Sequence, residues 1–328
     1  MKAIVYERYG PPDVLDLKEI AKPTPKDDEV LIEVYATTVT SGDARMRALR
    51  VPAGMELFAR LSLGVFGPRR QILGFELSGV VSAIGKSVTR FEVGDPVFGT
   101  PGLGLGCYAE YRAMPEGGVL ARKPENLTFE QAAAMCFGGT TALDFFRRGK
   151  LQSGERLLVN GASGSVGTAA IQLAKHFGAH VTGVCSTENL ELVLSLGADA
   201  VIDYKREDFT RNGETYDLIM DTAGTASFSR VKGSLNKGGR LLIVTGRVSD
   251  MLAAPWVNAT TDKRIVADMA GEKAEDVRLL AELAKTGKYV PAIDRTFPLK
   301  RIAEAHAYVD EGHKKGNVVI TVGGGSAT

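Results

Sequence analysis

The sequence predicts an α/β protein that combines a doubly wound parallel sheet with a second, β-rich domain. A short apolar run, a turn with glycine at every third position and a helix-forming run follow one another over residues 157–173. Apolar strand patterns and helix patterns then alternate as far as residue 267, which is typical of a parallel sheet. Before residue 126, strand patterns broken by Gly and Pro follow one another without long helices, as in a partly closed β-barrel.

The glycine-spaced turn, NGASGSVG at 160–167, is the strongest functional signal. Glycine at these spacings lets the backbone turn tightly, approach a pyrophosphate and pack the next helix against the strand. The helix N-terminus offers N–H groups and a partial positive charge to phosphates. The turn therefore predicts a dinucleotide site, and a purely structural turn is the alternative. The predicted loop contacts are Gly161, Ala162, Ser163, Gly164, Ser165, Val166 and Gly167.

The β-rich part is predicted from alternating apolar residues bounded by turn sequences. Its clearest strand patterns lie at 2–7, 29–38 and 77–84. Thr128 and Gln131 then form a capping-box pattern, which predicts a helix over 128–137 and a change in the character of the chain.

Residues 46–73 interrupt the β-rich part with large apolar side chains at helical spacing. Met55, Phe58, Leu61 and Leu63 would form the apolar side of a short helix. A helix that packs into the core is the favoured interpretation. A wall or lid over an apolar substrate is the alternative hypothesis.

The central part supplies six apolar strand patterns, enough for a full doubly wound sheet. They lie at 157–159, 180–185, 200–203, 216–221, 240–244 and 263–267. The last part mixes helix patterns with strand patterns, at 274–286, 290–297, 301–311 and 317–322. We expect the two ends of the chain to form one domain with the sheet inserted between them, and 323–328 to be disordered.

Composition sets the outer limits. The 328 residues suffice for two domains, and 40 Lys and Arg against 39 Asp and Glu leave a formal charge of +1. This balance gives no reason to expect nucleic acid or a membrane surface as a partner. A leader-like start and a bilayer-spanning apolar stretch are both missing from the sequence, so we expect a cytoplasmic protein. Three widely spaced cysteines, Cys107, Cys136 and Cys185, suit reduced thiols.

The chain resembles the zinc-independent members of the medium-chain dehydrogenase/reductase superfamily, near the quinone oxidoreductases and enoyl reductases. The matching segments are MKAIVYERYGPPDVL, GFELSGVVSAIGKSVTRFEVGDPVFG, GCYAEY, FGGTTAL, NGASGSVGTAAIQLAK and KKGNVVI. The resemblance implies a GroES-like, partly closed β-barrel catalytic domain and a Rossmann nucleotide-binding domain. The expected division is 1–125, catalytic; 126–268, nucleotide-binding; and 269–328, returning to the catalytic domain. A homodimer through the sheet edge near 264–267 is also implied.

Zinc-dependent members of that superfamily carry a catalytic Cys, a His-Glu pair and a further Cys. Here Phe75 precedes Glu76 in place of the His, and 40–43 takes the place of the first Cys. Cys136 lies near the remaining ligand position, but one thiolate cannot build a zinc site. We therefore expect no metal, a buried structural role for Glu76, and Cys136 as a small buried hydrophobe.

Without zinc, an alkoxide is poorly stabilised, so oxidation of simple alcohols is disfavoured. Hydride addition to a quinone or to the β-carbon of an enone is easier, because the charge spreads onto oxygen. We therefore expect an NADPH-dependent oxidoreductase acting on a small apolar quinone or α,β-unsaturated carbonyl. A nucleotide-binding regulatory or structural protein of the same fold is the alternative, and a zinc-free alcohol dehydrogenase is a weaker one.

Cofactor choice is predicted from the end of the second parallel strand, where NAD-preferring sites place an acid. Residues 185–187 are Cys-Ser-Thr instead, which favours NADPH, with Ser186, Tyr204 and Lys205 near the 2′-phosphate. Glu188 departs from this pattern. The Glu188 carboxylate either interacts favourably with the positive N-terminal end of its helix, which Ser186 or Thr187 would cap, or weakens phosphate binding.

The resemblance also implies residues around the nicotinamide. Thr40 and Asp43 stand where the family has Asn-x-x-Asp, and Thr140 of FGGTTAL matches a residue that approaches the ring. Asn317 stands where relatives often have a basic residue near the cofactor. Tyr108 of GCYAEY is a candidate catalytic residue, with a core aromatic as the alternative.

Overall fold

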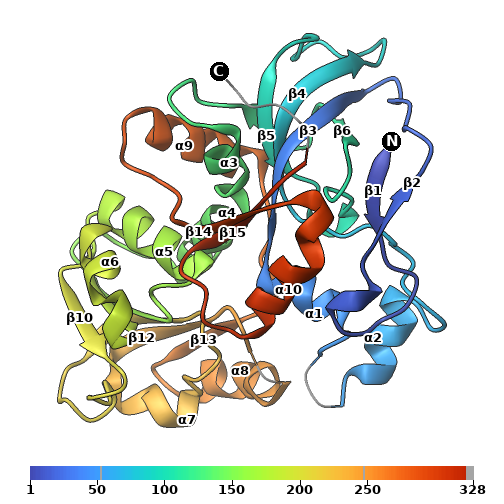
Figure 1. The fold of residues 1–328 in the computed structure, drawn as a ribbon. Helices are drawn as coiled ribbons and strands as arrows, with labels where there is room; N and C mark the ends of the chain where they lie inside the picture. Colours follow the sequence, from blue (N-terminus) through green and yellow to red (C-terminus); the bar gives the residue numbers. More distant parts are fainter. Residues whose placement is uncertain (52–53, 247, 323–328) are drawn as a thin grey trace. The chain divides into compact units, whose positions relative to one another are not determined.

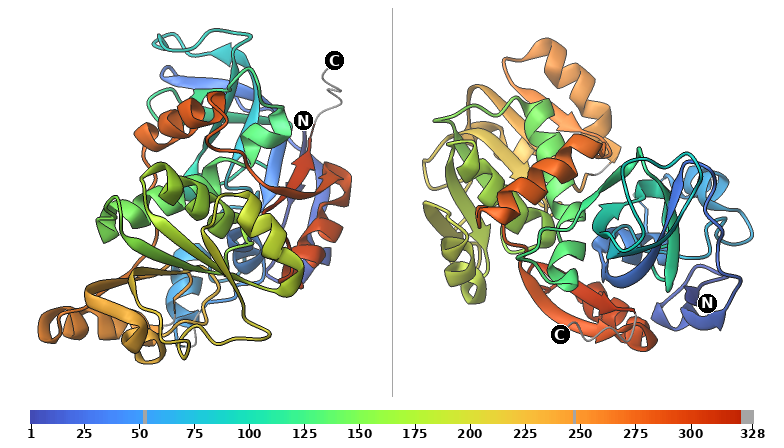
Figure 2. Two further views of the ribbon diagram at one scale, coloured as in Figure 1. Left: turned by 90° about the vertical axis from the view of Figure 1, so that its left-hand side faces the viewer. Right: turned by 90° about the horizontal axis from the view of Figure 1, so that it is seen from above.

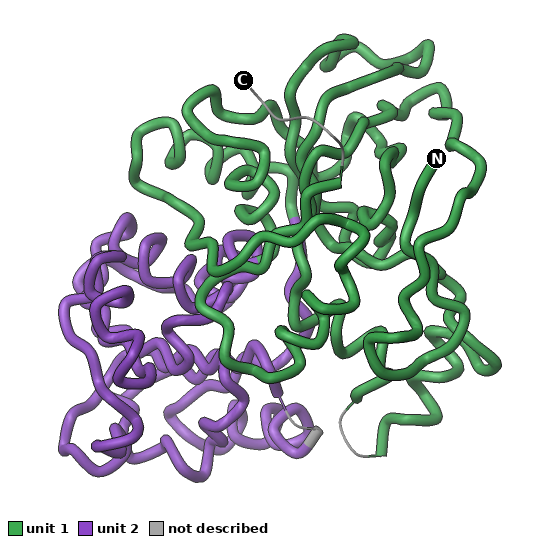
Figure 3. The backbone as a smooth tube through the Cα atoms, viewed as in Figure 1, with its two compact units in different colours: residues 1–137, 273–328 green, residues 138–272 purple. Residues whose placement is uncertain are grey.

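The computed structural model describes residues 1–51, 54–246 and 248–322. The chain forms two compact units, unit 1 from Met1–Phe137 with Lys273–Thr328, and unit 2 from Gly138–Glu272 (Figure 3). The chain passes from unit 1 to unit 2 within α4 (Cys136–Gly149). The predicted functional boundaries at 125/126 and 268/269 remain a prediction, and the expected disorder at 323–328 lies outside the described residues.

Unit 2 is built on a six-stranded parallel sheet in the order β10-β9-β8-β11-β12-β13 (Figures 1 and 2). The order reverses between β8 and β11, as in a doubly wound sheet. The strands are β8 (Arg156–Asn160), β9 (His180–Cys185), β10 (Ala200–Asp203), β11 (Tyr216–Asp221), β12 (Leu235–Ile243) and β13 (Arg264–Ala267). The helical elements are α5 (Ser165–His176), η3 (Thr187–Asn189), α6 (Leu190–Ser195), α7 (Phe228–Val231), η4 (Lys232–Ser234) and α8 (Val248–Thr260).

The six strands of unit 2 confirm the predicted parallel sheet, and β9, β10 and β11 have the predicted bounds. β12 begins at Leu235, before its predicted start at 240. Leu235 pairs with Tyr216, and the register then shifts so that Arg240 pairs with Leu218. Pairing with a neighbouring strand, rather than the local apolar run, therefore sets where β12 begins.

Unit 1 holds a seven-stranded sheet in the order β14-β15-β3-β4-β5-β7, with β6 paired to β3, and a separate β1-β2 ribbon. Its strands are β1 (Lys2–Val5), β2 (Asp16–Glu19), β3 (Glu29–Val39), β4 (Leu77–Ile84), β5 (Pro96–Thr100), β6 (Tyr111–Pro115), β7 (Val119–Arg122), β14 (Ile293–Pro298) and β15 (Asn317–Thr321). Its helical elements are η1 (Pro12–Val14), α1 (Ser41–Arg47), α2 (Glu56–Leu63), η2 (Gly102–Gly104), α3 (Phe129–Ala133), α9 (Ala274–Lys285), η5 (Leu299–Arg301) and α10 (Ile302–Asp310). The mostly antiparallel pairing confirms the predicted β-rich, GroES-like fold.

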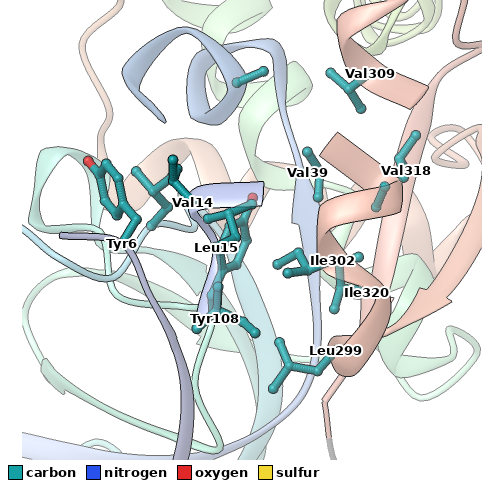
Figure 4. Packing of buried hydrophobic residues seen from close by; sticks show 14 of the residues in the cluster. Tyr6, Val14, Leu15, Val39, Tyr108, Leu299, Ile302, Val309, Val318 and Ile320 are labelled. Carbon is teal, nitrogen blue, oxygen red and sulfur yellow. The ribbon is translucent and has the colours of Figure 1, made fainter. Parts of the chain in front are cut away.

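The two ends of the chain share one sheet and one hydrophobic core in unit 1. β15 pairs antiparallel with β3, so that Val318 lies opposite Val39. Ile302 and Val309 of α10 pack in the same cluster as Tyr108 (Figure 4). Burial of these apolar side chains therefore holds the last part of the chain against the first.

The predicted core-packing helix at 46–73 is wrong. α2 forms there, but Leu57, Phe58 and Leu61 are 73%, 64% and 55% exposed, and Ala59 is the buried residue among its eight described positions. Helical spacing shows which side of a helix is apolar, but not whether another element covers that side. Within the described ranges, each helix falls short of the length or the apolarity that a bilayer crossing needs.

Candidate functional site

In unit 2, the predicted phosphate loop joins β8 to α5. Gly161 has a φ of +85°, and a Cβ at this position would lie 2.6 Å from Thr222 Oγ1. The N–H groups of Gly161 and Ala162 donate to the Val184 carbonyl at 3.1 and 2.9 Å, which anchors the loop to the end of β9. Gly164 caps α5 without a side chain. The amino end of α5 therefore opens at the carboxyl ends of the strands, beside the point where strand order reverses.

Two close backbone approaches hold this loop in place. A Cβ on Gly167 would lie 2.2 Å from the Gly161 carbonyl oxygen, so α5 packs directly on the turn. A Cβ on Gly138 would lie 2.5 Å from the Ser165 carbonyl oxygen, so α4 passes against the start of α5. α4 also carries Thr140, which is buried. Gly138 was not predicted as a site residue, although the paired glycines of FGGTT are a signal of close packing.

A polar network that the sequence analysis missed lies at the ends of β8 and β11. Asn160 Nδ2 donates to Asp221 Oδ1 and to Thr225 Oγ1, each at 2.8 Å. The Asp221 carboxylate also accepts three backbone N–H groups of residues 223–226, which fixes the turn after β11. The sequence did contain a signal, because Asn160 and Asp221 are polar residues at the last position of two apolar strands.

At the end of β9, Asn189 links the phosphate loop to the strand. Its Nδ2 donates to Ser163 Oγ at 3.2 Å and to Ser186 Oγ at 3.1 Å. Asn189 is 8% exposed, and its Oδ1 is buried without a hydrogen-bond partner in the described part of the chain. Two predicted cofactor residues, Ser163 and Ser186, are therefore brought together by a residue that the sequence analysis did not name.

Ser186 stands at the N-cap position of η3, as expected, but its side chain makes no capping hydrogen bond. The Thr187 hydroxyl donates to Asp203 at 2.5 Å. Glu188 forms an ion pair with Lys205 Nζ at 2.5 Å. The hydrogen bond from Lys205 lowers the pKa of Glu188 to about 2, so this carboxylate is charged at neutral pH. Tyr204, beside Lys205, is 57% exposed.

In unit 1, Thr40 and Asp43 form a capping box at the start of α1. Asp43 Oδ2 accepts the Thr40 N–H and hydroxyl at 2.9 and 2.6 Å, and its Oδ1 accepts the Gly74 N–H at 2.9 Å. Burial raises the pKa of Asp43 to about 6, although these hydrogen bonds oppose the shift. Tyr108 lies beside Asp43, and burial raises its pKa well above the ordinary value. Its hydroxyl is fully buried, and the charge of Asp43 adds to the rise in its pKa.

Glu76 is a second buried carboxylate in unit 1. Its Oε1 accepts the Thr38 hydroxyl at 2.5 Å, and its Oε2 accepts the Phe137 N–H at 2.6 Å. Burial raises the pKa of Glu76 to about 7, against these hydrogen bonds, and the charge of Asp43 adds to the shift. Glu76 therefore ties β3 to the start of α4.

Arg47 of α1 and His306 of α10 are buried polar residues that were not predicted from the sequence, and Arg47 joins the two helices through Asp310. Arg47 Nη2 donates to Asp310 at 2.5 Å, and its Nε donates to the Gly10 carbonyl at 3.1 Å. His306 packs edge-on against Tyr108, with 5.7 Å between ring centroids. Burial, helped by the charge of Arg47, lowers the pKa of His306 to about 3, so the imidazole is neutral at pH 7.

The remaining predicted positions also lie in unit 1. Asn317 is buried at the start of β15, and its Nδ2 donates to the Ala292 carbonyl at 3.0 Å. Phe75, which replaces a zinc-ligand His, packs on Phe137 with 5.9 Å between ring centroids. Cys136 is buried, as expected. Across the ranges that the structure describes, no group of three His, Cys, Asp or Glu side chains is placed to hold a metal ion.

Comparisons with known proteins identify the class. The family described as "Alcohol dehydrogenase GroES-like domain" matches residues 26–125, and "Zinc-binding dehydrogenase" matches residues 196–320. The NADPH-dependent alkenal/one oxidoreductase of Arabidopsis thaliana chloroplasts is 33% identical, over 98% of this chain and 79% of its own length. A chloroplastic quinone-oxidoreductase homolog of Spinacia oleracea is 32% identical over 98% of both chains.

A quinone oxidoreductase structure from Coxiella burnetii superposes with a TM-score of 0.86, at 28% identity, over 98% of this chain and 99% of that one. Fold and phosphate loop thus define an oxidoreductase of the medium-chain dehydrogenase/reductase superfamily. Within it, the chain belongs to the branch of quinone oxidoreductases and alkenal reductases.

Two glycine substitutions separate packing from ligand contact in the phosphate loop. Gly167→Ala forces a Cβ against the Gly161 carbonyl, so we expect unfolding free energy to fall by about 2 kcal/mol or more, and dinucleotide binding with it. Gly164→Ala meets an ordinary 3.5 Å contact, so its melting temperature should fall only slightly, because Ala is a poorer N-cap than Gly, and far less than that of Gly167→Ala. If it binds dinucleotide more weakly while remaining stable, the pyrophosphate lies against Gly164. Equal melting temperatures for both variants would contradict this packing.

The buried Glu76 should leave a signature in the pH dependence of stability. Its pKa is about 7 in the folded protein and ordinarily 4.5, so the unfolded state releases its proton first as pH rises. The favourable contribution of protonated Glu76 is therefore present below about pH 4.5 and lost as pH rises through about 7. We compare the free energies of unfolding of Glu76→Gln and of the wild type, measured by chemical denaturation at the same pH. The variant's value minus the wild-type value should rise by about 1–3 kcal/mol as pH increases from about 5 to about 8. The exposed Glu125→Gln is the control, and a pH-independent difference for Glu76→Gln would contradict the assignment.

Proposed function

We propose that this protein is an NADPH-dependent reductase that adds hydride to a quinone or an α,β-unsaturated carbonyl without zinc. The observation that carries the proposal is the full-length similarity to relatives named for alkenals, enones and quinones, all conjugated acceptors. Phe75 at a zinc-ligand position supports the same chemistry, because Phe cannot bind a metal. A conjugated acceptor needs only hydrogen-bond donors for its developing negative charge.

The residues of unit 2 fit a dinucleotide. Gly161 and Gly164 leave the backbone next to the amino end of α5 without side chains, which suits the close approach of a pyrophosphate. Ser186, Tyr204 and Lys205 are proposed to hold the 2′-phosphate of NADPH, and Thr140 to lie near the nicotinamide. When bound, NADPH supplies the hydride.

In unit 1 we propose positioning roles for the buried polar residues. Asp43 accepts three donors from two loops, so it fixes the backbone around Thr40 and Gly74 and is not itself in contact with solvent. Tyr108, whose buried side chain lies beside Asp43, is proposed to orient this polar core. Asn317 joins the start of β15 to Ala292, just before β14, and is proposed to contact the cofactor.

The direct test is turnover. We expect the protein to oxidise NADPH, measured by the loss of NADPH absorbance, in the presence of a panel of quinones, 2-enals and 2-enones. The rate with NADPH should exceed the rate with NADH, and a metal chelator should leave the rate unchanged. Activity that is lost with chelator and recovered with zinc would contradict the zinc-free mechanism. Tight NADPH binding with no turnover on the panel would favour the nucleotide-binding regulatory protein, and alcohol oxidation without metal would favour the zinc-free alcohol dehydrogenase.

The exposed apolar side of α2 is proposed to be a substrate wall, because nothing else in the described part of unit 1 covers Phe58. Phe58→Ala should raise KM for bulky apolar acceptors several-fold, through lost apolar contact, and leave the Kd of NADPH unchanged. Leu17→Ala removes a half-exposed apolar residue on β2 and serves as the control. A parallel change in KM and in cofactor Kd would argue against the wall.

A homodimer through the β13 edge is also proposed, although one side chain obstructs that edge. Asn258 accepts the outward Ile265 N–H at 2.7 Å and donates to its carbonyl at 3.1 Å, so its side chain occupies this edge. Asn258→Ala should therefore strengthen dimerisation, seen in sedimentation velocity as a shift toward twice the 35.0 kDa chain mass. A monomer for both proteins would rule out this interface.

A further inference from the structure

The carboxyl ends of β9 and β10 carry an ion pair at the position where the ribose of a dinucleotide is read. Glu188 lies three residues beyond Cys185, which ends β9, and Lys205 lies two residues beyond Asp203, which ends β10. Cys185 and Asp203 are paired in the sheet register, so the two chain ends leave the sheet side by side. Glu188 and Lys205 are about half exposed, at 59% and 47% of their side chains, so both are available to a ligand.

The same region contains an independent sign of a ligand. Asn189, the residue after Glu188, is more than nine-tenths buried and joins Ser163 of the phosphate loop to Ser186. Its other amide atom is buried without a partner among the described residues. A buried polar atom left in this state is costly, and an incoming hydroxyl or water would satisfy it.

We infer that Glu188 sets cofactor selectivity by holding Lys205 and competing with the 2′-phosphate of NADPH for it. The inference rests on the proposed function in that a dinucleotide must bind here. A 2′-phosphate brings nearly two negative charges to a site where one carboxylate already faces its lysine. The phosphate must share Lys205 and accept repulsion from Glu188, whereas NADH, which has a 2′-hydroxyl, meets no such repulsion and can donate to a carboxylate. Glu188 therefore lowers the ratio of the affinity for NADPH to the affinity for NADH.

The test is isothermal titration of NADPH and NADH into the wild type and two variants. We expect Glu188→Gln to bind NADPH about five- to tenfold more tightly, with NADH unchanged or weaker, because one like charge is removed and Lys205 is released. Lys205→Gln should bind NADPH about five- to tenfold more weakly. Both effects should shrink at high ionic strength, which a purely structural role would not produce.

Glu214→Gln is the matched control. It removes a carboxylate from a similar exposed pair, with Arg156, at the opposite ends of the strands, and should leave both affinities unchanged. An unchanged ratio of NADH to NADPH affinity in Glu188→Gln overturns the inference, while wild-type NADPH binding and turnover would leave the proposed function standing. If the wild type binds neither dinucleotide, the proposed function fails and the inference fails with it.

Discussion

A backbone contact with no room for a side chain, α5 against the turn after β8, is the constraint on which unit 2 depends. Gly167 meets the carbonyl of Gly161 at a distance that would exclude even a methyl group. Because the helix sits this low on the turn, its amino end faces the carboxyl edge of the sheet. Gly138 makes a similar close contact with the Ser165 carbonyl, which brings the start of α4 against α5. The turn after β8, the start of α5 and the start of α4 are thereby held against one another.

Two buried carboxylates organise the loops of unit 1. Asp43 and Glu76 each accept hydrogen bonds from segments far apart in the chain, and both remain hidden from solvent. Burial destabilises the charged form of each carboxyl group. The hydrogen bonds that these groups accept nevertheless hold the surrounding loops in place. These carboxylates thereby give the loops around Thr40, Gly74 and the start of α4 a fixed structure.

The two units place their charge differently. In unit 1 the distinctive acids and His306 are buried and shifted in pKa, whereas in unit 2 the distinctive pair, Glu188 and Lys205, is exposed at the strand ends. Buried groups of this kind hold backbone geometry, since they have no access to a ligand. Exposed groups at a nucleotide-binding edge are available to read the ligand itself.

The sequence by itself determined the parallel sheet, the phosphate loop, the β-rich domain and the family, because apolar periodicity and glycine spacing are local properties of the chain. It did not determine what covers α2, where β12 starts, or that Asn189 joins Ser163 to Ser186. It left open whether Glu188 serves its own helix or the cofactor site, and only the fold brought Lys205 to within 2.5 Å of it. Such outcomes depend on partners far away in sequence, which tertiary packing selects and no local pattern records.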